Sequence, residues 1–262
     1  MTIQYQLYRV FSDLLTGKAG NTSPVFLLEK EISAENMQSI AADMWQPACT
    51  FIWQDNDHWK VRWFAPDQEI SLCGHGSLAA IAHLNSQGYQ KAHLIAGEHE
   101  VKGGSSGNDS CFIELAPIPT QQKITQNEFW EEALGVAVLE HYQTTNKNII
   151  LTDSESSVLN MKPNFEKLRA SDIFGYAVTA AGSKVDFVSR TLVPHVHQLE
   201  DPATGSSHAA LAPFWQKKLN KNQMIAYQLS QRGGKFMIDC TSESVKLIGE
   251  YQQYGSGEIN LR

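Results

Sequence analysis

The sequence has few cysteines and no long hydrophobic run, and both absences restrict the class of protein. Its 262 residues include only four cysteines, without the spacing of a zinc site or a CxxC redox motif: Cys49, Cys73, Cys111 and Cys240. No apolar stretch approaches the length of a membrane span. The N-terminus also lacks the basic and then apolar segments of a signal peptide. We therefore expect reduced thiols, no membrane contact and a cytoplasmic protein.

Positive charge is also scarce. Lysine and arginine total 21 against 28 acidic residues, which gives a formal net charge of −7, and no dense basic run interrupts the chain. A nucleic-acid partner is therefore not expected, because phosphate binding needs a basic surface. Hydrophobic residues make up 42% of the sequence, which is sufficient for a sizeable core in each of two domains.

One stretch of the chain occurs in two versions. Residues 200–212 read Glu-Asp-Pro-Ala-Thr-Gly-Ser-Ser-His-Ala-Ala-Leu-Ala, and residues 69–80 read Glu-Ile-Ser-Leu-Cys-Gly-His-Gly-Ser-Leu-Ala-Ala. In both, the glutamate precedes the first glycine by the same number of positions, and an Arg-x-x-x-Pro sequence lies upstream. Small residues followed by a run that is apolar on every face indicate a loop that enters a buried helix. The repeat predicts that the chain is a duplicated lobe.

The start of each predicted helix is a candidate anion site, because unpaired N–H groups and the helix dipole favour a carboxylate or phosphate there. His75 follows the first glycine and is a candidate acid/base group, although a lone histidine before a buried helix is more often a capping or packing residue. Asp201 is the candidate on the other loop, although it is also a common turn former before proline. The candidate binding residues are the small residues at the two helix starts: Gly74, Gly76, Ser77, Gly205 and Ser206.

Local patterns predict many short strands and few helices. Ser33 is expected to cap a helix that continues to about Met44, and Thr125–Glu128 resembles a capping box for a helix ending near Gly135, as its counterpart in the second half. The glycine-rich residues 103–108 are expected to connect two strands. The expected lobes are residues 1–118, joined by the C-terminal strand, and residues 119–262. His195 and His197 lack a third ligand at useful spacing, so no metal is expected.

Several short motifs, in their joint order, carry a family resemblance: Gly20-Asn21, Arg62–Pro66, Glu69–Ala80, Asp186–Arg190, Glu200–Ser206 and Ser230–Gly234. Over nearly the whole chain the sequence resembles the PhzF-like (phenazine biosynthesis F-type) isomerases, which are related to diaminopimelate epimerase. The resemblance implies an α+β fold of two pseudo-symmetric lobes, each a curled β-sheet around a central helix. It further implies a biosynthetic role, a homodimer, no cofactor, and a small carboxylated metabolite bound in a cleft between the lobes.

The resemblance also implies roles for single residues. His75 and Asp201 would lie near the substrate, and the helix-start glycines and Ser206 would hold its carboxylate. The family's proton-shuttling glutamate is expected in a Ser-Glu-Thr-x-Phe pattern, and aligning that pattern on Phe51 places Ala48 at the glutamate position. Two hypotheses therefore stand: an isomerase-like protein that transfers a proton, and a non-catalytic small-anion binding or regulatory protein.

Two residues near Ala48 are candidates for a replacement base. Cys49 is adjacent and would act as a thiolate if its pKa were depressed, and Asp43 lies one helical turn earlier. Cys73 takes the position of one catalytic thiol of the related two-thiol epimerases, but the repeat pairs it with Thr204. A symmetric two-base racemase is therefore not expected.

Overall fold

The structure is a computed structural model that describes residues 2–13, 15–56 and 58–261. It divides into two compact units, the first formed by Met1–Leu115 together with Ile248–Arg262 and the second by Ala116–Leu247. Helices and strands are mixed in both, so the predicted α+β class is confirmed.

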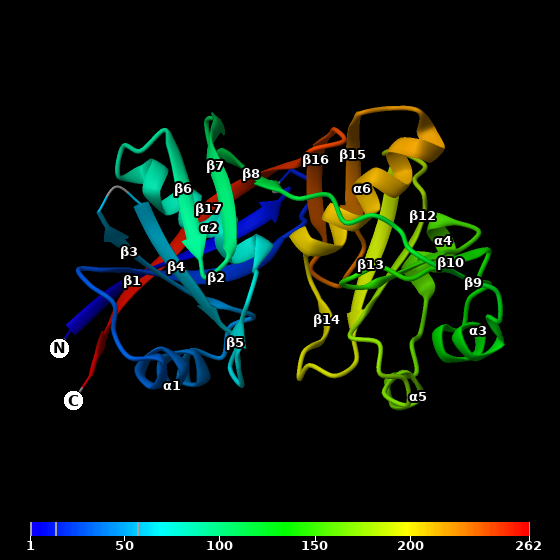
Figure 1. Ribbon diagram of the computed structural model, residues 1–262, viewed down its shortest axis with the longest axis horizontal. Helices are drawn as coiled ribbons and strands as arrows, with labels where there is room; N and C mark the ends of the chain where they lie inside the picture. Colours follow the sequence, from blue (N-terminus) through cyan, green and yellow to red (C-terminus); the bar gives the residue numbers. More distant parts are fainter. Residues whose placement is uncertain (1, 14, 57, 262) are drawn as a thin grey trace. The chain divides into compact units, whose positions relative to one another are not determined.

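The first unit is a ring of strands around one helix (Figure 1). Its elements are β1 (Thr2–Ser12), β2 (Asn21–Leu28), α1 (Ala34–Met44), β3 (Cys49–Asp55), β4 (His58–Phe64), β5 (Glu69–Ile70), α2 (Gly74–Ser86), β6 (Lys91–Ala96), β7 (His99–Gly107), β8 (Ser110–Leu115) and most of β17 (Val245–Asn260). The pairing runs β1, β2, β3, β4, β6, β7, β8, β17 and back to β1, with β2–β3 and β4–β6 parallel. Helix α2 is buried from Gly74 to Leu84 and contacts strands around this ring.

The second unit follows the same plan. Its elements are β9 (Lys123–Ile124), α3 (Glu128–Leu134), β10 (Glu140–Tyr142), β11 (Asn148–Leu151), α4 (Glu155–Asn160), α5 (Phe165–Leu168), β12 (Tyr176–Ala181), β13 (Phe187–Val193), β14 (Leu199–Asp201), α6 (Gly205–Leu219), β15 (Gln223–Gln228) and β16 (Gly234–Cys240). The strands pair in the order β9, β10, β11, β12, β13, β15, β16, with β11–β12 and β13–β15 parallel. Helix α6 is buried along most of its first ten residues, as the all-round apolar pattern predicted.

The strand pairing shows which helices correspond in the two halves. Helix α1 connects the parallel pair β2–β3, and the matching pair β11–β12 is connected by α4 and α5. Helix α3 precedes β10 and therefore lies outside this crossover. The prediction that the helix after Thr125 is the counterpart of the Ser33 helix is wrong, because a parallel pair needs its helix between the two strands.

Helix α1 forms as its sequence predicted. The Ser33 side chain accepts a hydrogen bond from the Asn36 N–H, which satisfies one of the free donors at the helix start. The apolar residues Met37, Ile40 and Ala41 are buried in a cluster with strand residues such as Phe26. These residues recur at helical spacing, so they lie on one face of α1 and bury it together.

Two local predictions are wrong. Residues 103–107 lie inside strand β7, because the absence of a side chain on Gly103 lets β7 approach Ile81 of α2 and the Phe112 carbonyl. Helix α3 begins at Glu128 after an Asn127 cap whose side chain makes no cap hydrogen bond, so Thr125 does not cap it. That helix does end at Gly135, whose left-handed conformation is typical of a C-terminal glycine.

All four cysteines are buried and free of disulfides. No helix in the described ranges is both long and apolar enough to cross a bilayer.

Candidate functional site

The start of α2 gathers the candidates of the first unit. Cys73 is the N-cap, and its Sγ accepts the Gly76 N–H at 3.4 Å while its carbonyl accepts the Ser77 hydroxyl at 2.7 Å. The His75 side chain is buried, with its two ring nitrogens 3.5 and 3.7 Å from the same sulfur. Gly74, His75, Gly76 and Ser77 therefore lie together in the first turn of a buried helix, and the partial positive charge of a helix start favours an anion.

Gly76 allows a tryptophan to approach this helix start. A Cβ atom at Gly76 would lie 2.5 Å from Trp63 Cδ1 and 2.7 Å from Thr50 Oγ1, so no larger residue fits without a shift. The Thr50 hydroxyl lies 2.8 Å from the Ser23 hydroxyl, and Ser23 donates to the Ala48 carbonyl at 2.8 Å. The backbone of Ala48, where the family glutamate is expected, is thus held close to the start of α2.

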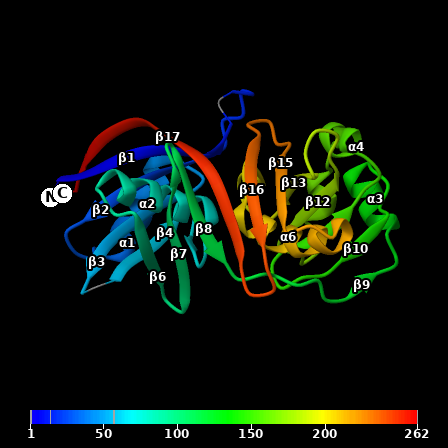
Figure 2. The ribbon, with the colours of Figure 1, turned by 90° about the horizontal axis from the view of Figure 1, so that it is seen from above.

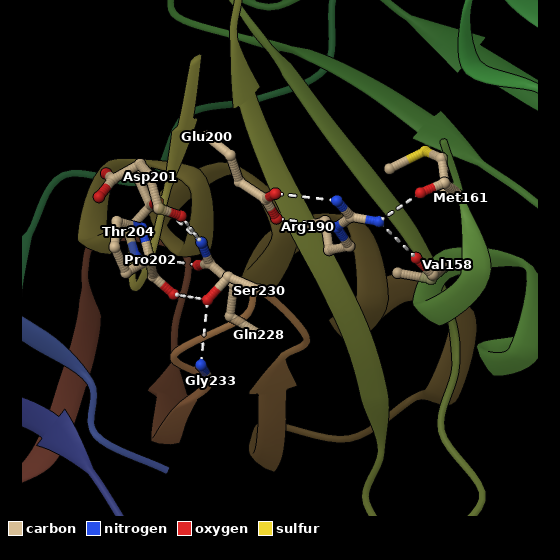
Figure 3. A network of polar contacts seen from close by, with 10 residues as sticks. All are labelled: Val158, Met161, Arg190, Glu200, Asp201, Pro202, Thr204, Gln228, Ser230 and Gly233. Carbon is tan, nitrogen blue, oxygen red and sulfur yellow. Dashed lines mark hydrogen bonds and ion pairs between the residues drawn. The ribbon is translucent and has the colours of Figure 1, made fainter. Parts of the chain in front are cut away.

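The start of α6 gathers the candidates of the second unit (Figure 3). Thr204 is the N-cap, its N–H donates to Gln228 Oε1 at 2.9 Å, and Gln228 Nε2 donates to the Asp201 carbonyl and to Thr204 Oγ1. The Ser230 hydroxyl donates to the Pro202 carbonyl at 2.7 Å. Buried Gln228 therefore fixes both ends of the loop from residue 201 to residue 204.

Asp201 and Ser206 lie at the two ends of this loop region. In Figure 3 the Asp201 carboxylate points away from Gln228, and only the Asp201 carbonyl faces the amide. Asp201 and Ser206 are half-buried, whereas Gly205 is buried. A fixed backbone with a partly accessible carboxylate is the arrangement that an acid/base group or an orienting group requires.

The repeated Arg and Glu residues form the same ion pair in both units. Arg62 Nε and Nη2 each donate to one Glu69 oxygen at 2.7 Å, and Arg190 Nε and Nη2 each donate to one Glu200 oxygen at 2.8 Å. The first pair is more exposed, and there the guanidinium of Arg62 holds the pKa of Glu69 below its usual range. Each two-pronged pair fixes the strand that leads into the helix-start loop.

Lys147 is a residue at the α6 start that the motif analysis did not identify. Its side chain is 4% exposed, and its Nζ donates to Ser206 Oγ at 3.0 Å and to Asn146 Oδ1 at 2.6 Å. No local sequence signal marks it, because Lys147 and Ser206 are brought together only by the tertiary fold. In the sequence it is one lysine between two asparagines, directly before the strand that begins at Asn148.

The structure weighs against Cys49 as a replacement base. Cys49 is fully buried in the apolar cluster that contains Phe51 and Phe64, and this burial raises its pKa to about 12. Its sulfur is therefore a protonated thiol at neutral pH, and a thiol cannot accept a proton. Asp43, the other candidate, is an exposed residue of α1.

His195 and His197, the histidines considered for a metal, are both exposed. His195 is exposed, and its Nε2 lies 2.8 Å from the Ser171 carbonyl. Over the part of the chain that the structure describes, no group of three or more His, Cys, Asp or Glu side chains is arranged to hold a metal ion.

Known proteins resemble this chain over most of its length. The sequence profile of the family described as "Phenazine biosynthesis-like protein" matches residues 8–253. An uncharacterised isomerase of Pseudomonas aeruginosa is 33% identical over 247 residues, which cover 93% of this chain and 94% of that protein. The chain therefore belongs to the phenazine biosynthesis-like (PhzF) family and is an isomerase-like protein.

Solved structures confirm the fold. A phenazine biosynthesis protein of the PhzF family from Enterococcus faecalis superimposes with a TM-score of 0.92 at 31% identity, covering 100% of both chains. A probable proline racemase from Agrobacterium radiobacter has a TM-score of 0.68 at 10% identity, covering 99% of this chain and 93% of that one. The second likeness is one of fold alone, and it supports two lobes of the epimerase type.

Proposed function

We propose that the protein is a cofactor-independent isomerase-like enzyme that moves a proton between two positions of a small carboxylated metabolite. In this proposal the metabolite binds in a cleft between the two units, where the starts of α2 and α6 both contact it. Gly74, Gly76, Ser77, Gly205 and Ser206 bind it through backbone N–H groups and hydroxyls. His75 and Asp201 act as the acid/base pair.

The duplicated helix start carries this proposal. In each unit an Arg–Glu ion pair fixes the chain ahead of a glycine that opens a buried helix. Such a helix start favours negative charge, and proton abstraction beside a carboxylate creates a developing negative charge. An imidazole and a carboxylate are both suited to proton transfer near neutral pH.

The test is solvent exchange into small carboxylates, including 2-amino and 2-hydroxy acids, followed by proton NMR in deuterated water. We expect the wild-type protein to exchange a carbon-bound proton in at least one of them. His75→Ala and Asp201→Asn should each slow the exchange by on the order of 10²–10⁴-fold, the usual contribution of a general acid or base. His99→Ala, at an exposed position of β7, is the matched control. Unchanged exchange in either site variant would remove that residue from the mechanism.

The alternative is a non-catalytic binding or regulatory protein of the same fold. The observation that favours it is Ala48, a buried residue without a proton-transferring group at the position of the family glutamate. Under this alternative, calorimetry detects carboxylate binding, and no carboxylate exchanges its proton. Gain of exchange in Ala48→Glu would support the alternative further, because it would show that only the base had been lost.

We further propose a homodimer in the cytoplasm, as the family resemblance implies. Size-exclusion chromatography with light scattering tests the dimer, and a mass of one chain would exclude it under those conditions.

A further inference from the structure

Lys147 is held rigidly at the beginning of the strand that faces the α6 start. The Thr144 hydroxyl accepts the Asn146 and Lys147 N–H groups at 3.1 Å each and donates to the Lys147 carbonyl at 2.7 Å. Thr144 and Lys147 are both buried, and Asn148 next to them begins β11. The direction in which the lysine side chain leaves the backbone is therefore fixed by the fold.

The ammonium group controls the orientation of a hydroxyl. An ammonium has only donors, so Ser206 Oγ must accept the hydrogen bond from Lys147 Nζ. The hydroxyl hydrogen of Ser206 then points away from the ammonium and is a donor toward its other side. The ring of exposed Phe174 lies 5.3 Å from the same Nζ, on another side of the group.

We propose that Lys147 is a positioning and specificity residue for the acidic group of the ligand at the start of α6. It fixes Ser206 as a donor, and its positive charge adds to that of the helix N-terminus, so a carboxylate gains from both. This inference rests on the proposed function, and it assigns the carboxylate of the ligand to the second unit.

The first unit has no charge at the equivalent position. In each unit, the register of the paired strands can be followed from the arginine of the Arg–Glu pair across the two neighbouring strands. This places Lys147 in the second unit at the position that Ser23 has in the first. The Ser23 hydroxyl contacts Thr50 Oγ1 and the Ala48 carbonyl, which are neutral groups. The start of α6 therefore has a buried lysine that the start of α2 lacks, beside the Asp201 carboxylate, and in our proposal this lysine distinguishes an acidic end of the ligand from a neutral end.

Calorimetry with paired probes tests this assignment. Benzoate and butyrate are compared with benzamide and butyramide, which are of similar shape and uncharged, at low ionic strength. For Lys147→Met we expect the carboxylate Kd to rise about ten-fold or more, as the loss of a charge-assisted hydrogen bond implies, with little change for the amides. Lys147→Arg should bind carboxylates within a few-fold of wild type. Lys217→Met removes an exposed lysine at the other end of α6 and is the matched control.

Three outcomes would overturn the inference, and they separate it from the proposed function. Wild-type carboxylate affinity in Lys147→Met, together with weaker binding in Ser206→Ala, would remove Lys147 and leave the proposed site. Equal losses for carboxylates and amides would mean that Lys147 only supports the structure. If the wild-type protein bound none of the carboxylates, the proposed function itself would fail. If Lys147→Met does not fold, the same carboxylate and amide Kd values are measured for Lys147→Gln, with the same expected results.

Discussion

The environment of His208 shows how burial determines the charge of a single residue. Its ring is fully buried, with the Phe236 ring centroid at 3.6 Å, and its Nδ1 lies 2.9 Å from the Thr204 carbonyl. Burial lowers the pKa of His208 to about 4, although the Thr204 carbonyl opposes the shift. His208 lies in the buried part of α6, which is apolar on nearly every face, and it is buried together with its neighbours.

This buried histidine gives a prediction for stability against pH. Between the ordinary value of 6.5 and about 4, the unfolded chain binds a proton at His208 that the folded chain does not. The stability contribution of this site is therefore complete above pH 6.5 and is lost as the pH falls toward 4. We expect a loss of roughly 1–3 kcal/mol from this residue.

Urea unfolding at a series of pH values measures this loss. His208→Gln should flatten the decline between pH 6.5 and 4, because glutamine does not titrate. His58→Gln, at an exposed position of β4, is the control and should leave the slope unchanged. An equally steep decline in His208→Gln would contradict the prediction.

At the scale of elements, the two Arg–Glu pairs have the same geometry in different surroundings. The Arg190 and Glu200 side chains are 13% and 20% exposed, against 24% and 43% for Arg62 and Glu69. Arg190 also donates to the Met161 carbonyl at 2.7 Å, so it joins β13 to the end of α4 (Figure 3). Arg62 also has a third partner, because its Nη1 donates to Glu31 Oε1 at 3.1 Å, but the Glu31 side chain is 52% exposed. The second pair is therefore the more buried of the two.

Replacing each arginine by lysine compares how much the two Arg–Glu pairs contribute to the free energy of unfolding. Arg190→Lys keeps the charge but cannot make both carboxylate bonds and the Met161 bond, so we expect a loss of about 2 kcal/mol in the free energy of unfolding. Arg62→Lys should cost less than about 1 kcal/mol, because solvent screens the exposed pair. Denaturant unfolding of both variants gives the comparison, and an equal or larger loss for Arg62→Lys would contradict it.

The elements that the sequence predicted well are those whose signal is local. The caps and apolar spacing of α1 and the small-residue runs of α2 and α6 are visible in the sequence itself. Gly103 was misinterpreted because a glycine between strands is ambiguous, and only the packing of Ile81 against it explains why the strand continues. A local sequence pattern does not show which other helix or strand packs against the residue.

The candidate site also has a part that the sequence predicts and a part that it does not. Repeated motifs in the sequence predict the two helix starts, because the duplicated segments keep the same residue types at the same spacing. The motif spacing did not show that Arg190 binds Glu200, and it gave no sign of Lys147 beside Ser206. Both are contacts between separate elements, and only the strand pairing brings these residues together.

At the scale of the whole chain, its last strand completes its first unit. From Ile248 onward β17 belongs to that unit, where it pairs with β8 on one side and antiparallel to β1 on the other, with Thr2 opposite Asn260. The two ends of the chain therefore lie side by side, as Figures 1 and 2 show. Without this strand, β1 and β8 would be open edges beside the buried helix α2.

Deleting residues 248–262 should therefore unfold the first unit, although its other strands are intact. The ring around α2 would open, and we expect the loss of the strand pairing with β1 and β8 to exceed what a unit of ordinary stability of about 5–15 kcal/mol can tolerate. Hydrogen exchange followed by mass spectrometry should show loss of protection in β1, β8 and α2.

A permuted chain provides the control for this deletion. In it, residues 248–262 are moved ahead of residue 1 and joined to it by a short glycine-containing turn, which the antiparallel register of β17 and β1 allows. This chain supplies the same strand from the other terminus, so protection in α2 should return. The two chains differ only in whether β1 and β8 have a partner strand. If α2 kept wild-type protection in the deleted chain, or stayed unprotected in the permuted chain, the pairing of β17 would not be what holds the ring together.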